Sequence, residues 1–80
     1  MGKRRVKFTF PTALITEPVI YTLGRKFQII TNIRRADVRE DMGWVVLELE
    51  GDEGEIDQGL KWVRNTGATV DLVSGDVLEG

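Results

Sequence analysis

The chain has 80 residues, of which 41% are hydrophobic and 30% charged, so we expect one globular domain with a simple core and a well-solvated surface. It contains no cysteine and no histidine, which excludes disulfides, thiolate metal sites, cysteine nucleophiles and the commonest general base. The net charge is −2, with the basic residues concentrated in the first half and the acidic residues in the second, which we interpret as complementary surfaces within one fold.

The first two predicted elements are a strand and a helix. Alternating apolar residues predict a strand over residues 5–10. The sequence Thr16-Glu17-Pro18 is typical of a helix start, with Thr16 as the cap and Glu17 in the first turn. We expect this helix to extend to Lys26, with Gly24 allowing close packing on a sheet. The expected buried residues of the two elements are Val6, Phe8, Phe10, Val19, Ile20, Leu23 and Phe27.

The second strand is predicted over residues 29–40 and contains one irregularity. Five residues suited to a buried face recur in it with period two, but the parity changes after the third. We therefore expect a one-residue bulge near Arg34 and Arg35, which keeps all five on the core face. The five residues are Ile29, Thr31, Ile33, Ala36 and Val38.

The clearest strand signal lies in residues 43–52. Val45, Leu47 and Leu49 alternate there with outward positions that include two glutamates, which predicts a strand with one buried face. Gly43 begins the stretch, and Gly51 with Asp52 ends it, so we expect a tight turn before it and a helix after it.

A second helix and a last strand complete the chain. Asp52 and Glu55 have the spacing of a capping box and predict a helix over residues 53–66. Gly67 is the expected C-terminal cap of this helix, and a strand follows over residues 68–73. The expected core residues of the helix are Ile56, Leu60 and Val63.

The order strand, helix, strand, strand, helix, strand predicts an α+β fold of the ferredoxin-like type. Right-handed crossovers place both helices on one face of a four-stranded antiparallel sheet, with the first and third strands in the centre. We expect a single domain over residues 1–80, with its core at about 5–73 and a frayed tail at 74–80.

The other face of this sheet is unusually apolar for a hydrated surface. Ile30, Trp44, Val46 and Val73 are expected there, and such a patch indicates a homodimer interface formed by Trp44, Val46 and Ile30. The simpler alternative is a set of scattered surface residues, which are normal singly.

No residue pattern indicates catalysis, a metal site or a cofactor, so we do not expect an enzyme. The glycines fit no phosphate-binding loop, and the acidic residues fit no calcium loop. The acidic residues are Glu48, Glu50, Asp52, Glu53, Glu55 and Asp57.

A nucleic-acid-binding module is the main competitor on fold grounds, but the third strand has one aromatic and two acidic residues where base-stacking aromatics are needed. Only Lys7, Arg34 and Arg35 favour it, and we expect no nucleic acid partner. The longest apolar run, Trp44 to Leu47, is far short of the roughly 20 residues of a membrane span. We therefore expect a cytoplasmic protein without direct membrane insertion.

Seven short segments carry a family resemblance. They are Phe8-Thr9-Phe10, Glu17-Pro18-Val19-Ile20, Arg25-Lys26-Phe27, Thr31-Asn32-Ile33, Leu47-Glu48-Leu49-Glu50-Gly51-Asp52, Leu60-Lys61-Trp62-Val63 and Gly67-Ala68-Thr69-Val70-Asp71-Leu72. In this order they resemble the NIL domain, a ferredoxin-like module found at the C-terminus of methionine-importer ABC ATPases and attached to some 4Fe–4S ferredoxin proteins. The resemblance covers about residues 6–73.

The resemblance implies a regulatory domain without catalytic activity that binds a small molecule, an amino acid such as methionine, near a dimer interface formed by its sheet. Asn32 and Ile33 match the naming motif of the family, and Arg34 replaces its aliphatic third residue. With Ile30 they are the expected ligand-binding residues. Arg34 places a charge in a pocket suited to a thioether, so an acidic or differently sized ligand stays open beside methionine.

The resemblance also implies a partner, an ABC transporter or a ferredoxin, because this chain has neither an ATPase motif nor cysteines for a cluster. The alternative is a homodimerisation or protein-docking module that binds no ligand.

Overall fold

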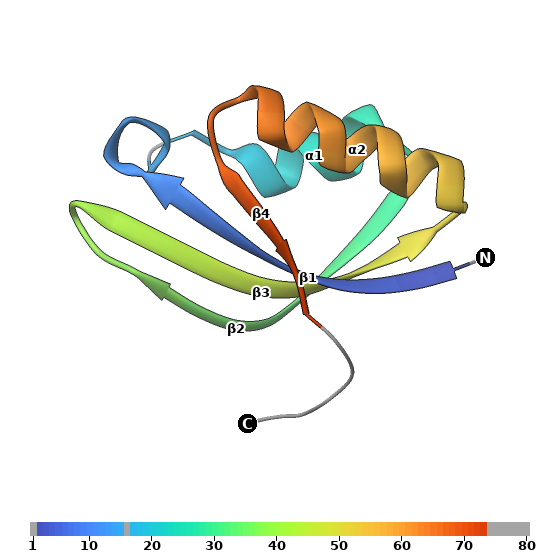
Figure 1. Ribbon diagram of the computed structural model, residues 1–80, viewed down its shortest axis with the longest axis horizontal. Coiled ribbons are helices and arrows are strands. Elements are labelled where there is room, and N and C mark those ends of the chain that lie inside the picture. Colours follow the sequence, from blue (N-terminus) through green and yellow to red (C-terminus); the bar gives the residue numbers. More distant parts are fainter. Residues whose placement is uncertain (1, 16, 74–80) are drawn as a thin grey trace.

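The computed structural model, which describes residues 2–15 and 17–73, has two helices on one face of a four-stranded antiparallel sheet (Figure 1). The elements are β1 (Gly2–Pro11), the 3₁₀ turn η1 (Thr12–Leu14), α1 (Val19–Lys26), β2 (Ile29–Val38), β3 (Met42–Gly51), α2 (Glu53–Asn65) and β4 (Thr69–Leu72). The strand order β2-β3-β1-β4 puts the first and third strands in the centre, which confirms the predicted ferredoxin-like fold. The predicted tail at residues 74–80 lies outside the described residues.

The central strands β1 and β3 pair over their whole length, from Gly2 opposite Gly51 to Pro11 opposite Met42. β1 is longer than the predicted segment because β3 offers ladder partners at both of its ends. Alternate residues of both strands point toward the helices and are buried, as their period-two pattern predicts. The buried residues are Val6, Phe8, Phe10, Val45, Leu47 and Leu49.

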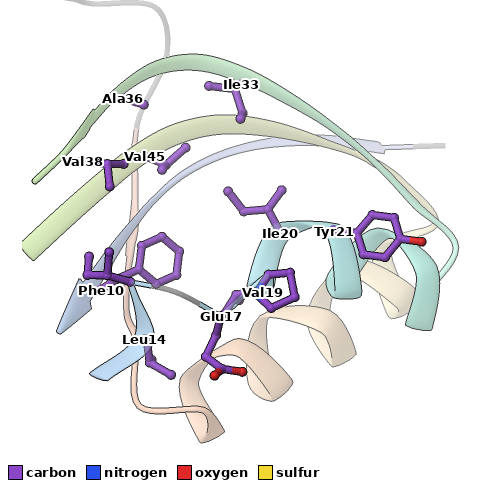
Figure 2. Close-up of a pocket in the computed structure, with 12 residues that line it drawn as sticks. Phe10, Leu14, Glu17, Val19, Ile20, Tyr21, Ile33, Ala36, Val38 and Val45 are labelled. Atoms are coloured by element: carbon purple, nitrogen blue, oxygen red, sulfur yellow. The ribbon is translucent and has the colours of Figure 1, made fainter. Parts of the chain in front are cut away.

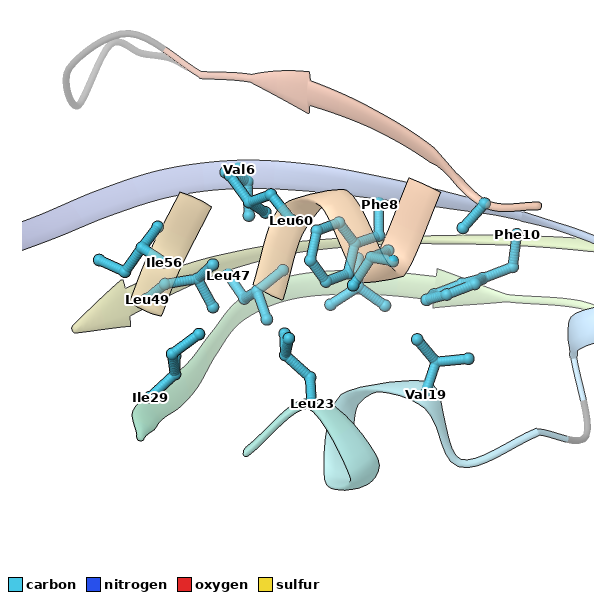
Figure 3. Packing of buried hydrophobic residues seen from close by; sticks show 13 residues of the cluster. Val6, Phe8, Phe10, Val19, Leu23, Ile29, Leu47, Leu49, Ile56 and Leu60 are labelled. Carbon is cyan, nitrogen blue, oxygen red and sulfur yellow. The ribbon is translucent and has the colours of Figure 1, made fainter. Parts of the chain in front are cut away.

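The hydrophobic core lies between this central pair and the two helices (Figure 3). Each fully buried side chain of Leu, Ile or Val size stabilises the fold by about 1.5–3 kcal/mol relative to an exposed one. Ile20 and Phe27, predicted as core residues, pack against the core but are only partly buried. The helix residues that are buried are Val19, Leu23, Ile56, Leu60 and Val63.

α1 begins at Val19, later than the predicted start. Pro18 occupies the N-cap position without a side-chain cap, and Glu17 precedes the first turn instead of lying in it. The connection before the helix has turns of its own: η1 covers residues 12–14, and the Val19 N–H donates to the Glu17 carbonyl oxygen (2.8 Å). Thr16, the predicted cap, lies outside the described residues. The predicted end at Lys26 is confirmed.

α2 begins with the predicted cap, because the Asp52 carboxylate accepts a hydrogen bond from the Gly54 N–H (3.1 Å). The second half of the predicted capping box does not form, since Glu55 instead accepts from the backbone N–H of Gln28 (3.0 Å). Gly67 has a φ of 108° just after the helix, which confirms the predicted C-terminal cap. In the part of the chain that the structure describes, no helix is long and apolar enough to cross a membrane.

β2 contains the predicted bulge, seen as a register shift between Ile33 and Arg35. The strand ends at Val38, two residues earlier than predicted, because the Arg39 N–H closes the hairpin onto the Met42 carbonyl oxygen (2.8 Å). All five predicted residues face the helices, but only one of them, Ile29, is buried. The prediction of their face is confirmed, and the prediction of a core position is wrong for the other four.

Glycine-to-alanine substitutions in the two helices should change stability in opposite directions. A methyl group at Gly24 would meet only the Ile29 carbonyl oxygen at 3.6 Å, an ordinary contact, so the expected close packing at Gly24 is wrong. Gly24→Ala should therefore raise the free energy of unfolding by about 0.5–1 kcal/mol, because alanine favours the helix.

At Gly59 of α2 the methyl group would lie 2.7 Å from Ile29 Cδ1 and 2.9 Å from Leu23 Cδ1, both in the core. We expect Gly59→Ala to lower the free energy of unfolding by about 1–2 kcal/mol, since overpacking outweighs the gain in helix propensity. Urea unfolding of both variants measures the difference. A stabilised Gly59→Ala variant would show that the core yields at this position.

Candidate functional site

The predicted ligand-binding residues lie on β2, an edge strand whose one neighbour among the described strands is β3. The register places Ile30 and Asn32 on the helix-free face of the sheet and Ile33 on the helix side. Arg34 is the unpaired residue of the bulge. The structure thus brings the four residues together along one strand but divides them between its two faces.

Asn32 lies opposite Glu48 of β3. The hairpin fixes this register by pairing the end of β2 with the start of β3, so that the middle of β2 falls opposite the second half of β3. Glu48 also faces Arg5 of β1, whose Nη2 lies 3.5 Å from Glu48 Oε2. The exposed Asn32 amide is therefore next to a pair of opposite charges on the helix-free face.

Trp44 and Val46 form the apolar centre of the helix-free face, and both are half-buried. Lys7 Nζ lies 5.1 Å from the centroid of the Trp44 ring, a cation–π contact worth about 0.5–1 kcal/mol at an exposed site. Ile30 is 61% exposed and lies opposite Glu50. On this face the pair of Asn32 with Glu48 stands between Ile30 and Val46. Of the three residues of the predicted dimer interface, Trp44 and Val46 are therefore adjacent, whereas Ile30 is separated from them by Asn32 and Glu48.

A well-developed hollow lies on the helix side of β2 (Figure 2), with a volume of about 290 Å³. Its walls are the second half of β2, the start of α1 and the η1 connection. It forms because α1 has eight residues and is about 12 Å long, whereas β2 and β3 have ten residues each and extend over about 33 Å. We call this hollow the α1 cavity.

The bulge makes the β2 wall of the α1 cavity apolar. With regular pairing after Ile33, Arg35 and Asp37 would face the helices, because side chains alternate along a strand. The extra residue instead turns Ala36 and Val38 toward the cavity. It also places Arg35 opposite Val46 on the helix-free face, the position that Arg34 would occupy in a regular strand.

Two of the twelve residues that line the α1 cavity have side chains with polar ends, Glu17 and Tyr21. Figure 2 shows the Glu17 carboxylate directed away from the β2 wall and the Tyr21 hydroxyl on the side of its ring that is turned away from Ile33 and Val38. The Tyr21 hydroxyl accepts a hydrogen bond from Arg25 Nη1 (3.1 Å), and Glu17 also borders a second hollow of about 250 Å³ on the α2 side. The side chains that face the α1 cavity are therefore apolar.

Sequence reasoning did not identify the α1 cavity, because it assigned the β2 wall to the core. The signal that could have found it is a mismatch of lengths. A helix that ends at Lys26 and starts after a proline cannot cover the hairpin end of two ten-residue strands.

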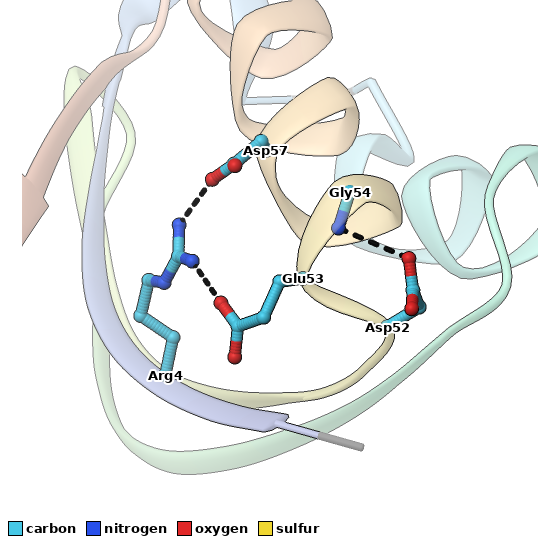
Figure 4. A network of polar contacts seen from close by, with 5 residues as sticks. All are labelled: Arg4, Asp52, Glu53, Gly54 and Asp57. Carbon is cyan, nitrogen blue, oxygen red and sulfur yellow. Dashed lines mark hydrogen bonds and ion pairs between the residues drawn. The ribbon is translucent and has the colours of Figure 1, made fainter.

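The acidic residues after β3 bind structural partners. Arg4 of β1 donates hydrogen bonds to Asp57 (2.6 Å) and to Glu53 (Figure 4). The hydrogen bond to Asp57 first, and then the one to Glu53, raises the pKa of the Arg4 guanidinium above its ordinary value. Within residues 2–15 and 17–73, no group of three or more carboxylates is arranged to hold a metal ion.

A matched pair of valine substitutions should separate the cavity wall from the core. Val38 is 59% exposed, so Val38→Ala should lower the free energy of unfolding by less than about 1 kcal/mol. Val45 on the neighbouring strand is 4% exposed, and Val45→Ala should cost about 2–3 kcal/mol through lost burial and a new void. Thermal or urea unfolding measures both. Equal losses would mean that Val38 belongs to the core.

Comparison with known proteins identifies the family. A family model of the NIL domain matches residues 4–72. The C-terminal domain of an ABC transporter ATP-binding protein from Enterococcus faecalis has a similar structure, with a TM-score of 0.78 and 16% identity over 91% of this chain and 86% of that chain. The de novo designed protein Ferredog-Diesel has a TM-score of 0.54 and 17% identity over 91% of this chain and 85% of its own. At these identities both likenesses show the fold, and no curated protein matches. Because the family model spans most of its length, this chain belongs to the NIL domain family.

Proposed function

We propose that this NIL domain is a regulatory domain that binds a free amino acid and has no catalytic activity of its own. The observation that carries the proposal is the family match over residues 4–72, within which Asn32 and Ile33 occupy the middle of an exposed edge strand. The likeness to a domain of an ABC transporter ATP-binding protein supports a transporter ATPase in the cytoplasm as the partner.

The surroundings of Asn32 suit the polar end of an amino acid. Its amide has two donors and an acceptor, and it lies opposite Glu48, which pairs with Arg5. A zwitterion carries an ammonium and a carboxylate, so this neighbourhood offers each of them a complementary charge and a hydrogen-bonding amide. Arg34 in the adjacent bulge adds a positive charge, which favours an amino acid with an acidic or polar side chain over methionine.

A second copy of the chain would complete this site. A small molecule on a sheet surface is covered from one side only, whereas small-molecule sites bury most of the ligand surface. Trp44 and Val46 are apolar and half-buried, and a homodimer through the helix-free face would cover them together with the ligand. Ligand binding and dimerisation would then stabilise one another.

The competing functions are less well supported by the same face. A nucleic-acid module needs a basic sheet surface with stacking aromatics, but β3 presents Glu48 and Glu50 beside its single aromatic residue, Trp44. A docking module without a ligand would use the same apolar centre of Trp44 and Val46.

A screen for ligands distinguishes this docking module from our proposal. Free amino acids, methionine and the acidic ones first, are added to the protein, and a ligand of the native state raises the melting temperature.

Asn32→Ala should weaken binding of whichever amino acid scores in the screen by about 1–3 kcal/mol, or roughly 5- to 150-fold in Kd. The reason is that polar atoms of the bound ligand lose their partner. Isothermal titration calorimetry measures the change, and Asn65→Ala at the end of α2 is the matched control that should bind as the wild type does. Equal affinity of Asn32→Ala and wild type would remove Asn32 from the site.

Trp44→Glu should convert the dimer into a monomer, because it places a charge in the apolar centre of the proposed interface. Sedimentation velocity at high micromolar concentration measures the oligomeric state. Tyr21→Glu makes the same change on the helix side and should leave the dimer intact. A wild type that sediments as a monomer, or a Trp44→Glu variant that stays dimeric, would contradict the proposed interface.

A further inference from the structure

We propose that the α1 cavity is a second binding site, separate from the Asn32 face, for a small neutral molecule with an aromatic or branched aliphatic body. The cavity gathers apolar surface that the fold leaves uncovered. Tyr21, Ile33 and Val38 line it with exposures of 64%, 54% and 59%. They are three of the six large apolar side chains that are exposed in the described part of the chain. Exposed apolar side chains that lie together are typical of binding surfaces, whereas single exposed apolar residues are normal on any protein surface.

The bulge in β2 supports a role for this wall beyond packing. Charged Arg35 and Asp37 would face the helices in a regular strand, and water would solvate them at this open end of the sheet. The bulge turns them away and presents Ala36 and Val38, which no other part of the described structure buries. Apolar side chains on an uncovered wall add little to the stability of the fold. They do favour binding of an apolar ligand, because the ligand displaces water from them.

The lining determines the charge of the ligand. The polar ends of Glu17 and Tyr21 are turned away from Ile33 and Val38, and every other side chain that lines the cavity is apolar. A charged group that entered would lose water without gaining a partner, which is costly. A free amino acid, with two charges on its α-carbon, is therefore a ligand for the Asn32 face and not for the α1 cavity.

The volume sets the size of the ligand. An apolar cavity of about 150 Å³ is large enough for benzene. The α1 cavity, at about 290 Å³, has room for one ring with substituents or for a branched chain of similar size. Because it opens to solvent along the hairpin end of the sheet, a hydroxyl or amide on the ligand can stay hydrated while the apolar body is buried.

Three probes with one ring and different charges test the proposal on the full chain. Benzyl alcohol is neutral, benzylamine is a cation and benzoate is an anion at pH 7. In NMR titrations at millimolar probe concentration we expect saturable shifts at Ile20, Ile33 and Val38 with benzyl alcohol. Both ions should bind about fivefold more weakly or not at all, because the cavity offers them no partner. Equal binding of an ion, or shifts centred on the helix-free face, would overturn the proposal.

Substitutions in the wall locate the binding. Ala36→Phe fills the cavity and should abolish the saturable shifts, while Thr69→Phe adds the same ring on the helix-free face and should leave them unchanged. Val38→Asp is a second variant that puts a charge on the wall without filling it, and it should also abolish binding. Asn32→Ala should not affect the probes. Retained binding in Ala36→Phe or Val38→Asp would overturn the proposal. The protein is also diluted without any probe. NMR shifts at Ile33 and Val38 on dilution would overturn the proposal as well, because they would mean that a second copy of the chain covers the cavity.

Discussion

The in-register pairing of β1 with β3 is the constraint on which the rest of the structure depends. Ten consecutive pairs join the two strands, and a slip of one residue would turn the apolar side chains of the slipped strand toward water. Burial of Phe8 and Leu47 against the helices therefore fixes the register as firmly as the hydrogen bonds do. Contacts on the other face, such as that of Lys7 with Trp44, follow from the same register.

The edge strand β2 depends on this central pair through β3 alone, which leaves it free to be irregular. A bulge in a central strand would disturb two ladders, whereas the bulge at Arg34 disturbs one. Because the bulge shifts the parity in mid-strand, the second half of β2 presents Arg35 and Asp37 to the helix-free face and Ala36 and Val38 to the α1 cavity. Asn32 and Ile33, adjacent in sequence, thus serve opposite faces of the sheet.

Strong periodic signals made most of the fold predictable, including β1, β3, α2 and, through the right-handed crossovers, the strand order. The bulge was also predictable, since an apolar pattern that changes parity within a strand stays on one face only if an extra residue is inserted. The sequence does not show how far the helices cover the sheet or how the two strands of the hairpin are paired. The exposure of Val38 depends on the length of α1, and the partner of Asn32 depends on the hairpin register. Both are tertiary facts, and both decide the candidate sites.

Uncovered apolar surface has a particular meaning in a domain of this size. A chain of 80 residues buries only about 60–65% of its unfolded surface and has a small margin of stability. Each apolar side chain left in water lowers that margin relative to a covered one, and each ligand or second copy that covers it raises the stability by mass action. Occupancy of either face of β2 is then coupled to how firmly the edge strand is held. Because both faces share that strand, a small molecule on one side would change the rigidity of the surface on which we propose the dimer contact. In the proposed function, this coupling is the physical means by which a bound ligand regulates a partner protein.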